Sequence, residues 1–208
     1  RDFAVNHEKE LHLIVVRSDG NGYRHVHPRL DERTGIWSLP WTWPEGGSYR
    51  VFVDFIPSTV ENRPEITLSR NLDVSGNFTP VQLPVSGTDP VDGFEVSLNG
   101  DLVAGESRKL TATISRDGVP ETHLEPYLGA FGHLVVLREG DLAYLHVHAA
   151  DSHEAPANAG EGHLHDGSTA GPEIEFETSA PTTGRYLLFL DFKADGRVHT
   201  ARFVMEAR

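Results

Sequence analysis

Two short segments of the chain carry histidines in one shared pattern, Tyr-x-His-x-His. They are Tyr23-Arg-His25-Val-His27 and Tyr144-Leu-His146-Val-His148. On a β-strand, side chains two residues apart share a face and lie about 6–7 Å apart, so both imidazoles of a pair can bind one ion. Neutral imidazole nitrogen is a good ligand for zinc, copper(II) and nickel. The pattern therefore predicts a divalent transition metal as cofactor, copper(II) or zinc.

Such a site needs about four ligands, usually from more than one strand. In the second half of the chain, His133 precedes the motif by one expected strand, and Asp191 and His199 lie on the last expected hairpin. A three-residue loop Ala194-Asp195-Gly196 would place Asp191 opposite His199, whereas a loop of two or four residues would separate them. The predicted metal ligands are His133, His146, His148, Asp191 and His199 in the second half, and His12, His25, His27 and Asp54 in the first.

Four further histidines are candidate accessory ligands, namely His7, His153, His163 and His165. The last three stand among acidic residues in a segment rich in Gly and Ala. That segment is either a solvated insertion or a metal-collecting flap over the second site. His7, close in sequence to Glu8 and Glu10, either reaches the first site or belongs to a frayed terminus.

Each of these residues also has a purely structural interpretation. A single histidine on a strand is more often a surface residue or a hydrogen-bonded core residue than a ligand. Asp54 and Asp191 could end their strands by accepting backbone hydrogen bonds. The repeated spacing of the two motifs nevertheless favours at least one metal site.

The two histidine motifs belong to a longer internal repeat. His12-Leu-Ile-Val-Val-Arg17 resembles His133-Leu-Val-Val-Leu-Arg138, and 13 residues separate the first His from the His-Val-His pair in both copies. Each copy continues into a Gly-x-Tyr segment, at Gly47 and at Gly184. The second copy inserts a loop between His148 and Glu173. This pattern predicts two related domains.

The elements that carry these residues are short, rich in Val, Leu, Phe and Tyr, and bounded by turn formers, which is typical of β-strands. We predict an all-β fold of two tandem immunoglobulin-like or cupredoxin-like β-sandwich domains. Tyr49 and Tyr186 resemble the tyrosine corner of such sandwiches. The strands expected in the second domain lie near Phe94–Leu98, Arg108–Ser115, His133–Arg138, Leu142–His148, Glu173–Ser179, Arg185–Phe192 and Arg197–Met205.

Turn formers cluster between the two copies and place the domain boundary. We predict a shorter first domain over residues 1–86, a linker over 87–93, and a second domain over 94–208 with an inserted loop at 149–172. The strand after Tyr186 is apolar on both faces, with Leu187 and Phe189 on its second side. That face is predicted to pack against the other domain or against a second protomer.

Charge and composition limit the partners. A net charge of −13 disfavours nucleic acid and anionic membranes and favours cations. Zero cysteines exclude disulfides and thiolate metal sites. No apolar run approaches the roughly 20 residues of a membrane helix, so we expect no direct membrane insertion. The chain begins at Arg1 rather than Met, which suits a removed signal peptide or lipoprotein leader, although a shortened chain would begin the same way.

The run from Tyr127 to His148, together with Gly184 to Phe192 and Val198 to Ala201, resembles a family of secreted or membrane-anchored actinobacterial proteins. The run from His12 to Pro28 resembles the other half of the same family. Members of this family are often described as heavy-metal or copper related. The resemblance implies export, as a secreted, periplasmic or cell-surface protein, and association with metal, but supplies no reaction. The sequence departs from the family at Ala149, where Pro is common, and in the histidine-bearing loop that follows.

Three classes of function fit these observations. The leading one is an extracytoplasmic copper- or zinc-binding protein for sequestration, delivery or homeostasis, acting as a homodimer or with a metal-transport partner, with the second domain better equipped. The alternative is a metalloenzyme with an open position on three His or Asp ligands. The third is an interaction module whose histidines are incidental. The sequence holds no nucleophile elbow and no phosphate loop, which disfavours an enzyme and leaves no catalytic residues to assign.

Overall fold

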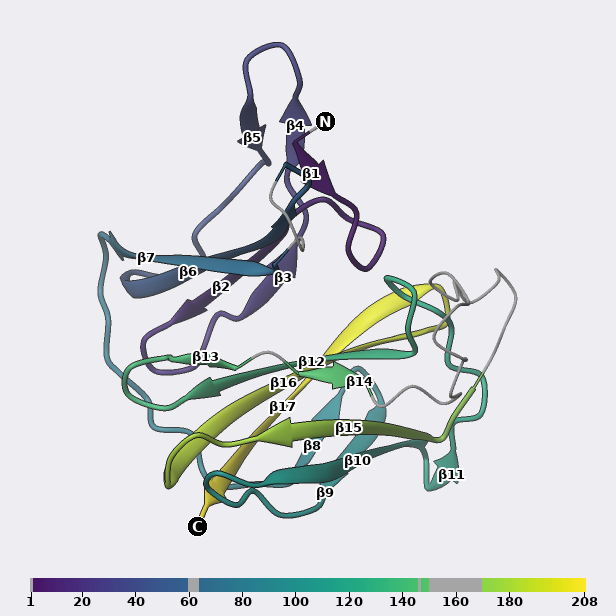
Figure 1. Ribbon diagram of the computed structural model, residues 1–208. Helices are drawn as coiled ribbons and strands as arrows, with labels where there is room; N and C mark the ends of the chain where they lie inside the picture. The colour runs from purple at the N-terminus through teal and green to yellow at the C-terminus, as the bar shows by residue number, and fades with distance from the viewer. Residues whose placement is uncertain (1, 60–63, 146, 150–169) are drawn as a thin grey trace. The chain divides into compact units, whose positions relative to one another are not determined.

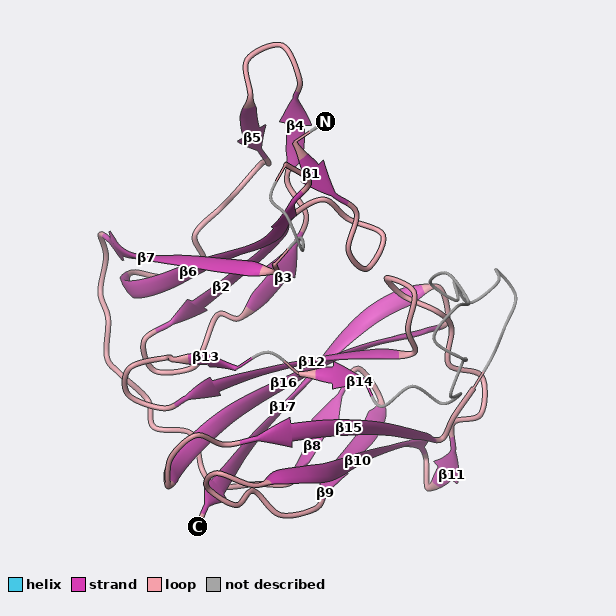
Figure 2. Ribbon diagram, in the orientation of Figure 1, coloured by secondary structure: helices cyan, strands magenta, loops and turns pink. Residues whose placement is uncertain are grey.

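The structure is a computed structural model that describes residues 2–59, 64–145, 147–149 and 170–208. The chain divides into two compact units, Arg1–Leu83 and Pro84–Arg208. Strands joined by turns and loops make up the described residues, and none of these residues forms a helix (Figure 2). The prediction of an all-β protein is therefore confirmed. Among the described residues there is no helix long and apolar enough to cross a membrane.

The first unit is built on one antiparallel five-stranded sheet (Figure 1). Strand β2 lies between β3 and β6, and β1 and β7 both pair with β6. A separate two-stranded ribbon, β4 with β5, follows β3 in the chain. The strands are β1 (Phe3–Ala4), β2 (His12–Arg17), β3 (Arg24–Val26), β4 (Arg29–Asp31), β5 (Ile36–Ser38), β6 (Gly47–Pro57) and β7 (Ile66–Val74).

A tyrosine corner anchors the start of the long strand β6. The Tyr49 hydroxyl donates a hydrogen bond to the backbone oxygen of Glu45 over 3.0 Å, and the ring packs against Trp43 at a centroid distance of 4.7 Å. In the second unit the Tyr186 hydroxyl donates in the same way to the oxygen of Thr182, over 2.8 Å. Both tyrosine corners expected from the sequence are confirmed. Each satisfies a buried hydroxyl while its ring fills the core.

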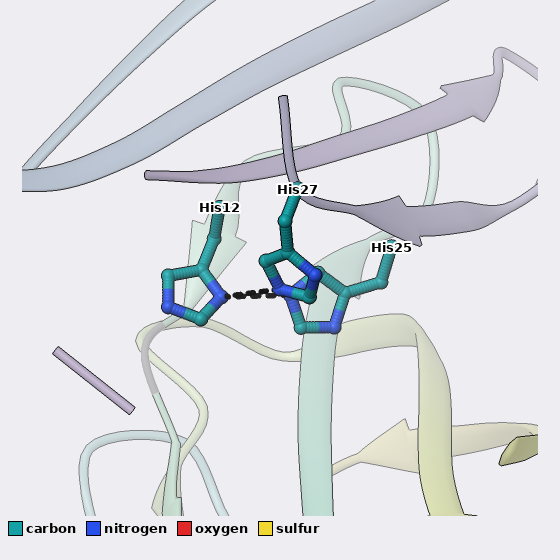
Figure 3. A group of neighbouring side chains, drawn as sticks. All are labelled: His12, His25 and His27. Atoms are coloured by element: carbon teal, nitrogen blue, oxygen red, sulfur yellow. Dashed lines mark hydrogen bonds between the residues drawn. The ribbon is translucent and has the colours of Figure 1, made fainter. Parts of the chain in front are cut away.

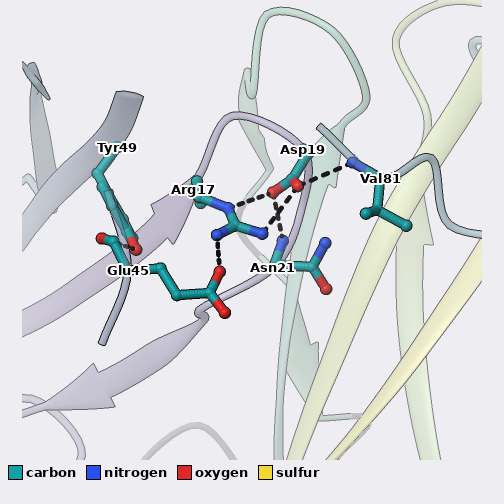
Figure 4. Close-up of polar contacts among 6 residues, drawn as sticks. All are labelled: Arg17, Asp19, Asn21, Glu45, Tyr49 and Val81. Atoms are coloured by element: carbon teal, nitrogen blue, oxygen red, sulfur yellow. Dashed lines mark hydrogen bonds and ion pairs between the residues drawn. The ribbon is translucent and has the colours of Figure 1, made fainter. Parts of the chain in front are cut away.

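A buried ion pair shapes the turn between β2 and β3 (Figure 4). The Arg17 guanidinium donates two parallel hydrogen bonds to the Asp19 carboxylate, of 2.8 and 3.0 Å, and also contacts Glu45. Asp19 in turn accepts hydrogen bonds from the backbone N–H groups of Asn21 and Val81, each 3.1 Å long. We call these contacts the Arg17 clamp. Because the clamp holds the turn between β2 and β3, it supports the pairing of the two strands that carry the first histidine motif.

The second unit is a sandwich of two antiparallel sheets. One runs in the order β14-β15-β10-β9-β8, with β11 paired to β10, and the other in the order β13-β12-β16-β17 (Figure 1). The strands are β8 (Thr88–Val91), β9 (Phe94–Asn99), β10 (Ser107–Arg116), β11 (Val119–Pro120), β12 (Gly132–Arg138), β13 (Tyr144–Leu145), β14 (His148–Ala149), β15 (Glu173–Ser179), β16 (Gly184–Ala194) and β17 (Arg197–Ala207).

Inward-facing apolar side chains from the two sheets of the second unit form one core. Strand β15 shows the alternation most clearly, because Ile174 and Phe176 are buried and the neighbouring Glu173, Glu175 and Glu177 are exposed. Strand β16 is buried on both faces, as its apolar sequence indicated. Leu187 and Phe189 are buried but do not belong to this core. That the face with Leu187 and Phe189 packs against the other domain or a second protomer stays a prediction.

Two expectations about the second unit differ from the structure. Residues 87–93, expected to be a linker, instead form β8 and a tight turn at Asp92-Gly93 that pairs β8 with β9. Their turn formers serve a hairpin, and Pro90 is tolerated there because β8 is an edge strand. The strand expected from Leu142 to His148 is also wrong. The chain pairs first with β12, as β13, and then with β15 of the other sheet, as β14.

Candidate metal centre

The first histidine motif lies beside the start of β2. Leu13 pairs with Val26 and Ile14 pairs with His25, so the same register places His27 opposite His12 and His25 diagonally across from it. Because paired residues of antiparallel strands share a face, the three imidazoles belong to one side of the sheet. Figure 3 shows the three rings pointing toward one another. Residues that are 13 and 15 positions apart in the sequence therefore meet.

Three ring nitrogens converge at this point. The Nδ1 atom of His12 lies 3.0 Å from Nε2 of His25 and 3.2 Å from Nε2 of His27. One ligand atom from each of the three histidines lies within 4.8 Å of the other two. Metal–nitrogen bonds of 2.0–2.1 Å at tetrahedral angles separate neighbouring nitrogens by about 3.3 Å. The spacing around His12 is close to that value, and the three residues form a group that could hold a metal ion.

A hydrogen bond sets the orientation of the His12 ring. Its Nε2 atom lies 3.0 Å from the backbone oxygen of Asn6. A carbonyl oxygen only accepts hydrogen bonds, so the proton of the neutral ring must sit on Nε2. Nδ1 is then left with its lone pair directed at His25 and His27. Ligand histidines in metal sites are commonly held in this way by a bond from the second ring nitrogen.

The surroundings of His12 keep its ring neutral. Burial lowers the pKa of His12 to about 4, because a charged ring would lose its hydration. The hydrogen bond to Asn6 opposes this shift, and the neighbouring His25, His7 and Lys9 add to it. At neutral pH the imidazole is therefore uncharged. That is the form that binds a metal ion.

Asp54, expected as a ligand, faces the same side of the sheet. It pairs with His12 across β2 and β6, is buried, and accepts a hydrogen bond of 3.1 Å from the Thr67 hydroxyl. Glu65 bonds to Asp54 and accepts a hydrogen bond of 3.0 Å from the Asn6 side chain. Burial raises the pKa of Glu65, and these two hydrogen bonds oppose the shift. Asp54 and Glu65 therefore form a hydrogen-bonded pair of acidic residues beside His12.

The second unit repeats part of this geometry. The Nε2 atom of His133 lies 2.7 Å from the backbone oxygen of Tyr127, and His133 pairs with Asp191 across β12 and β16. Asp191 accepts a hydrogen bond of 2.6 Å from the Thr200 hydroxyl. Like His12, His133 therefore has Nε2 next to a backbone oxygen six residues earlier and an aspartate opposite it on the neighbouring strand. The relation of the two units by duplication stays a prediction.

The other expected ligands of the second unit are placed only in part. His148 lies in β14, where its backbone pairs with Glu177 of β15. The predicted ligand His146 and the accessory histidines His153, His163 and His165 lie outside the described residues. Among the described residues, the group of three that could hold a metal ion lies in the first unit. The sequence had favoured the second.

The structure separates His199 from Asp191. Strand β16 pairs with β17 so that Ala194 lies opposite Arg197, which leaves a two-residue loop, Asp195-Gly196. Of the loop lengths that the sequence left open, the structure has the two-residue one, and both residues adopt positive φ angles, of 51° and 71°, as in a type I′ turn. Asp191 consequently lies opposite Thr200, and His199 lies opposite Phe192. The two side chains therefore belong to opposite faces of the sheet.

His199 has structural contacts in its own unit. The ring packs against Phe94 and Phe192, with centroid distances of 4.9 and 5.3 Å. Its Nδ1 atom lies 2.8 Å from a carboxylate oxygen of Asp92, and Nε2 lies 3.3 Å from the backbone oxygen of Ala194. It is a hydrogen-bonded core residue, which was the structural alternative for each histidine.

Sequence reasoning missed Asn6. Its backbone oxygen orients His12 and its side chain contacts Glu65. Any residue type supplies a backbone oxygen, so the presence of Asn at position 6 could not indicate that its backbone oxygen orients His12. The available signal is a parallel in spacing, because Asn6 precedes His12 and Tyr127 precedes His133 by six residues each.

A search of curated proteins found no significant match to this sequence. A family described as Domain of unknown function (DUF8832) matches residues 1–70 and 89–208. The match includes the whole of β2 and β3, and therefore His12, His25 and His27. Both units contribute to it. With most of its length matched, the chain belongs to the family of domains of unknown function DUF8832.

Proposed function

We propose that the first unit binds one divalent transition metal ion through His12 Nδ1, His25 Nε2 and His27 Nε2. The observation that supports this most strongly is the convergence of these nitrogens, 3.0 and 3.2 Å apart around His12. The neutral state of His12 and the proton held on its far nitrogen support it further. A ligand needs a free lone pair, and this arrangement aims one at the other two rings.

The donor set favours copper(II) or zinc. Imidazole nitrogen suits zinc, copper and nickel better than magnesium or calcium, which prefer oxygen ligands. With zero cysteines and one methionine, the chain offers no thiolate and no methionine-rich site for copper(I). The net charge of −13 attracts cations and offsets the charge of a metal held by neutral ligands.

We infer a role in sequestering or delivering this metal outside the cytoplasm. The sequence resemblance to secreted and membrane-anchored proteins that are described as copper related supports this role. The alternative is a metalloenzyme, because catalytic zinc sites typically combine three protein ligands with one open position. A filled fourth position favours storage or delivery, and an open one favours catalysis.

The test is metal stoichiometry. Native mass spectrometry and calorimetry of the full chain with zinc or copper(II) should show that the His25→Ala/His27→Ala double variant binds one metal ion fewer than the unchanged protein. His123→Ala is the matched control, because His123 is exposed in the second unit and should leave the stoichiometry unchanged. A double variant that keeps both the stoichiometry and the affinity of the unchanged protein would disprove the proposal.

A further inference from the structure

A tight hairpin turn precedes β2 and carries His7. The backbone groups of Asn6 and Lys9 exchange two hydrogen bonds, of 2.8 and 3.0 Å. The two residues between them, His7 and Glu8, both adopt positive φ angles, of 46° and 62°. This is the geometry of a type I′ turn, where Asn, Asp and Gly are the usual residues. A histidine in this left-handed region of backbone conformation is strained, because its Cβ crowds the backbone.

The corresponding turn of the second unit shows what this position does in the absence of a histidine. Tyr127 and Ala130 exchange the same pair of hydrogen bonds, and the residues between them, Leu128 and Gly129, have φ angles of 55° and 77°. Leu128 is buried in its unit, whereas His7 is exposed. Packing therefore explains the strained residue of the second turn. It does not explain His7.

The turn holds His7 next to His12, one of the three converging histidines. Its ring centroid lies 6.2 Å from that of His12. The centroids of His12, His25 and His27 are 4.9 to 5.2 Å apart. His7 therefore lies about 1 Å farther from His12 than His25 and His27 do, and its exposed side chain can rotate about its own torsions toward the group. The residue before it, Asn6, already orients His12 through its backbone oxygen.

We propose that His7 is the fourth ligand of the metal centre. When a metal ion enters between the three rings, the His7 ring turns onto it and completes a centre of four imidazoles. The inference rests on the proposed function, because a fourth ligand requires the first three. It assigns the hairpin turn two tasks, which are to aim the Nδ1 atom of His12 and to close the site.

A closed centre determines which role the site can have. With four protein ligands, the metal has no open position at which a substrate or an activated water could bind, as in structural zinc sites. Because it is exposed, His7 would be the last ligand to close on an incoming ion and the first to detach when the ion is released. This arrangement favours a protein that holds a metal ion and hands it on.

The experiment compares the full chain with His7→Gly. Glycine suits the positive φ angle, so the unfolding midpoint of the metal-free variant should stay the same or rise. Its affinity for zinc and for copper(II) in calorimetry should fall by at least about tenfold, since even outer-shell partners of metal sites are worth 10–100-fold. Glu8→Gly makes the same backbone change one residue later and should bind within about threefold of the unchanged protein. His7→Asn, which also tolerates this turn, serves if the glycine variant is poorly folded.

Electron paramagnetic resonance of the copper(II) form gives a second readout, because His7→Gly should lose one coordinating nitrogen. Unchanged affinity and an unchanged nitrogen count in both His7 variants would overturn the inference and leave the three-histidine site standing. If the unchanged protein binds neither metal, both proposals fail. If Glu8→Gly weakens binding as much as His7→Gly, the turn acts only through its backbone, and the inference is again overturned.

Discussion

Substituting Arg17 with Met should destabilise the first unit. The substitution keeps an apolar stem and removes the guanidinium that donates to Asp19 over 2.8 and 3.0 Å. The side chains of both residues are almost fully buried, with 8% and 4% exposed. Removing one partner of a buried ion pair leaves the other charge without compensation, which typically costs 3–5 kcal/mol. Asp19 keeps its hydrogen bonds from the backbone of Asn21 and Val81, so we expect a loss of about 2–3 kcal/mol in the free energy of unfolding.

The pKa of Asp19 gives an independent magnitude and a pH dependence. Burial raises this pKa, but the hydrogen bonds from Arg17, Val81 and Asn21 lower it by more. The net result is a pKa of about 2, against the ordinary 3.8. A shift of this size corresponds to about 2 kcal/mol. Because the pKa of Asp19 is lower in the folded protein than in the unfolded chain, the ionised carboxylate stabilises the fold fully above about pH 4. This stabilisation is lost as the pH falls toward 2. The difference between Arg17→Met and the unchanged protein should therefore shrink over that range.

Tryptophan fluorescence during urea denaturation is a suitable assay, because Trp37, Trp41 and Trp43, the three tryptophans of the chain, all belong to the first unit. Arg138→Met is the matched control. Arg138 holds the same place in the second copy of the sequence pattern, but its pair with Asp141 is exposed, at 35% and 48%. Followed by circular dichroism, it should cost clearly less stability than Arg17→Met, because solvent screens an exposed ion pair. A loss below about 1 kcal/mol for Arg17→Met at pH 7, or one that stays constant down to pH 2, would refute the reasoning.

Two further predictions concern the metal and the second unit. At a free metal concentration 100 times the dissociation constant, zinc or copper(II) should stabilise the tryptophan-monitored transition by about 2.7 kcal/mol, and a chelator should remove this gain. The His25→Ala/His27→Ala variant should show no such gain, and an equal gain in it would place the metal elsewhere. Tyr186→Phe should lower the free energy of unfolding of the second unit by about 1 kcal/mol, because it deletes the 2.8 Å hydrogen bond to Thr182. Circular dichroism during denaturation measures this, and an unchanged midpoint would contradict it.

Much of the local structure was predictable from the sequence. Alternating apolar residues and turn formers indicated strands, and the observed strands β9, β10, β12, β15, β16 and β17 lie where they were expected. The tyrosine corners were predictable because they need only one residue type at the start of a long strand and a carbonyl four residues earlier. A strand extends its side chains with a period of two, so His25 and His27 had to share a face.

The choice among candidate ligands was not predictable in the same way. His12 meets His25 and His27 because Leu13 pairs with Val26, and a slip of one residue in that register would turn both motif histidines to the other face. His199 is separated from Asp191 because the last hairpin closes with two loop residues instead of three. Spacing alone suggested the second unit as the better site, and that ranking depended on His199.

The sequence by itself determined which residues have metal-binding chemistry, which of them share a strand face, and where most of the strands of the second unit lie. These are local properties, set by residue type, by backbone torsions and by the period of an extended chain. Only the tertiary structure decided that His12 points Nδ1 at two other imidazoles, and that the turn at Asn6 lies against it. Those contacts depend on strand register and turn length, which the packing of distant parts of the chain selects together.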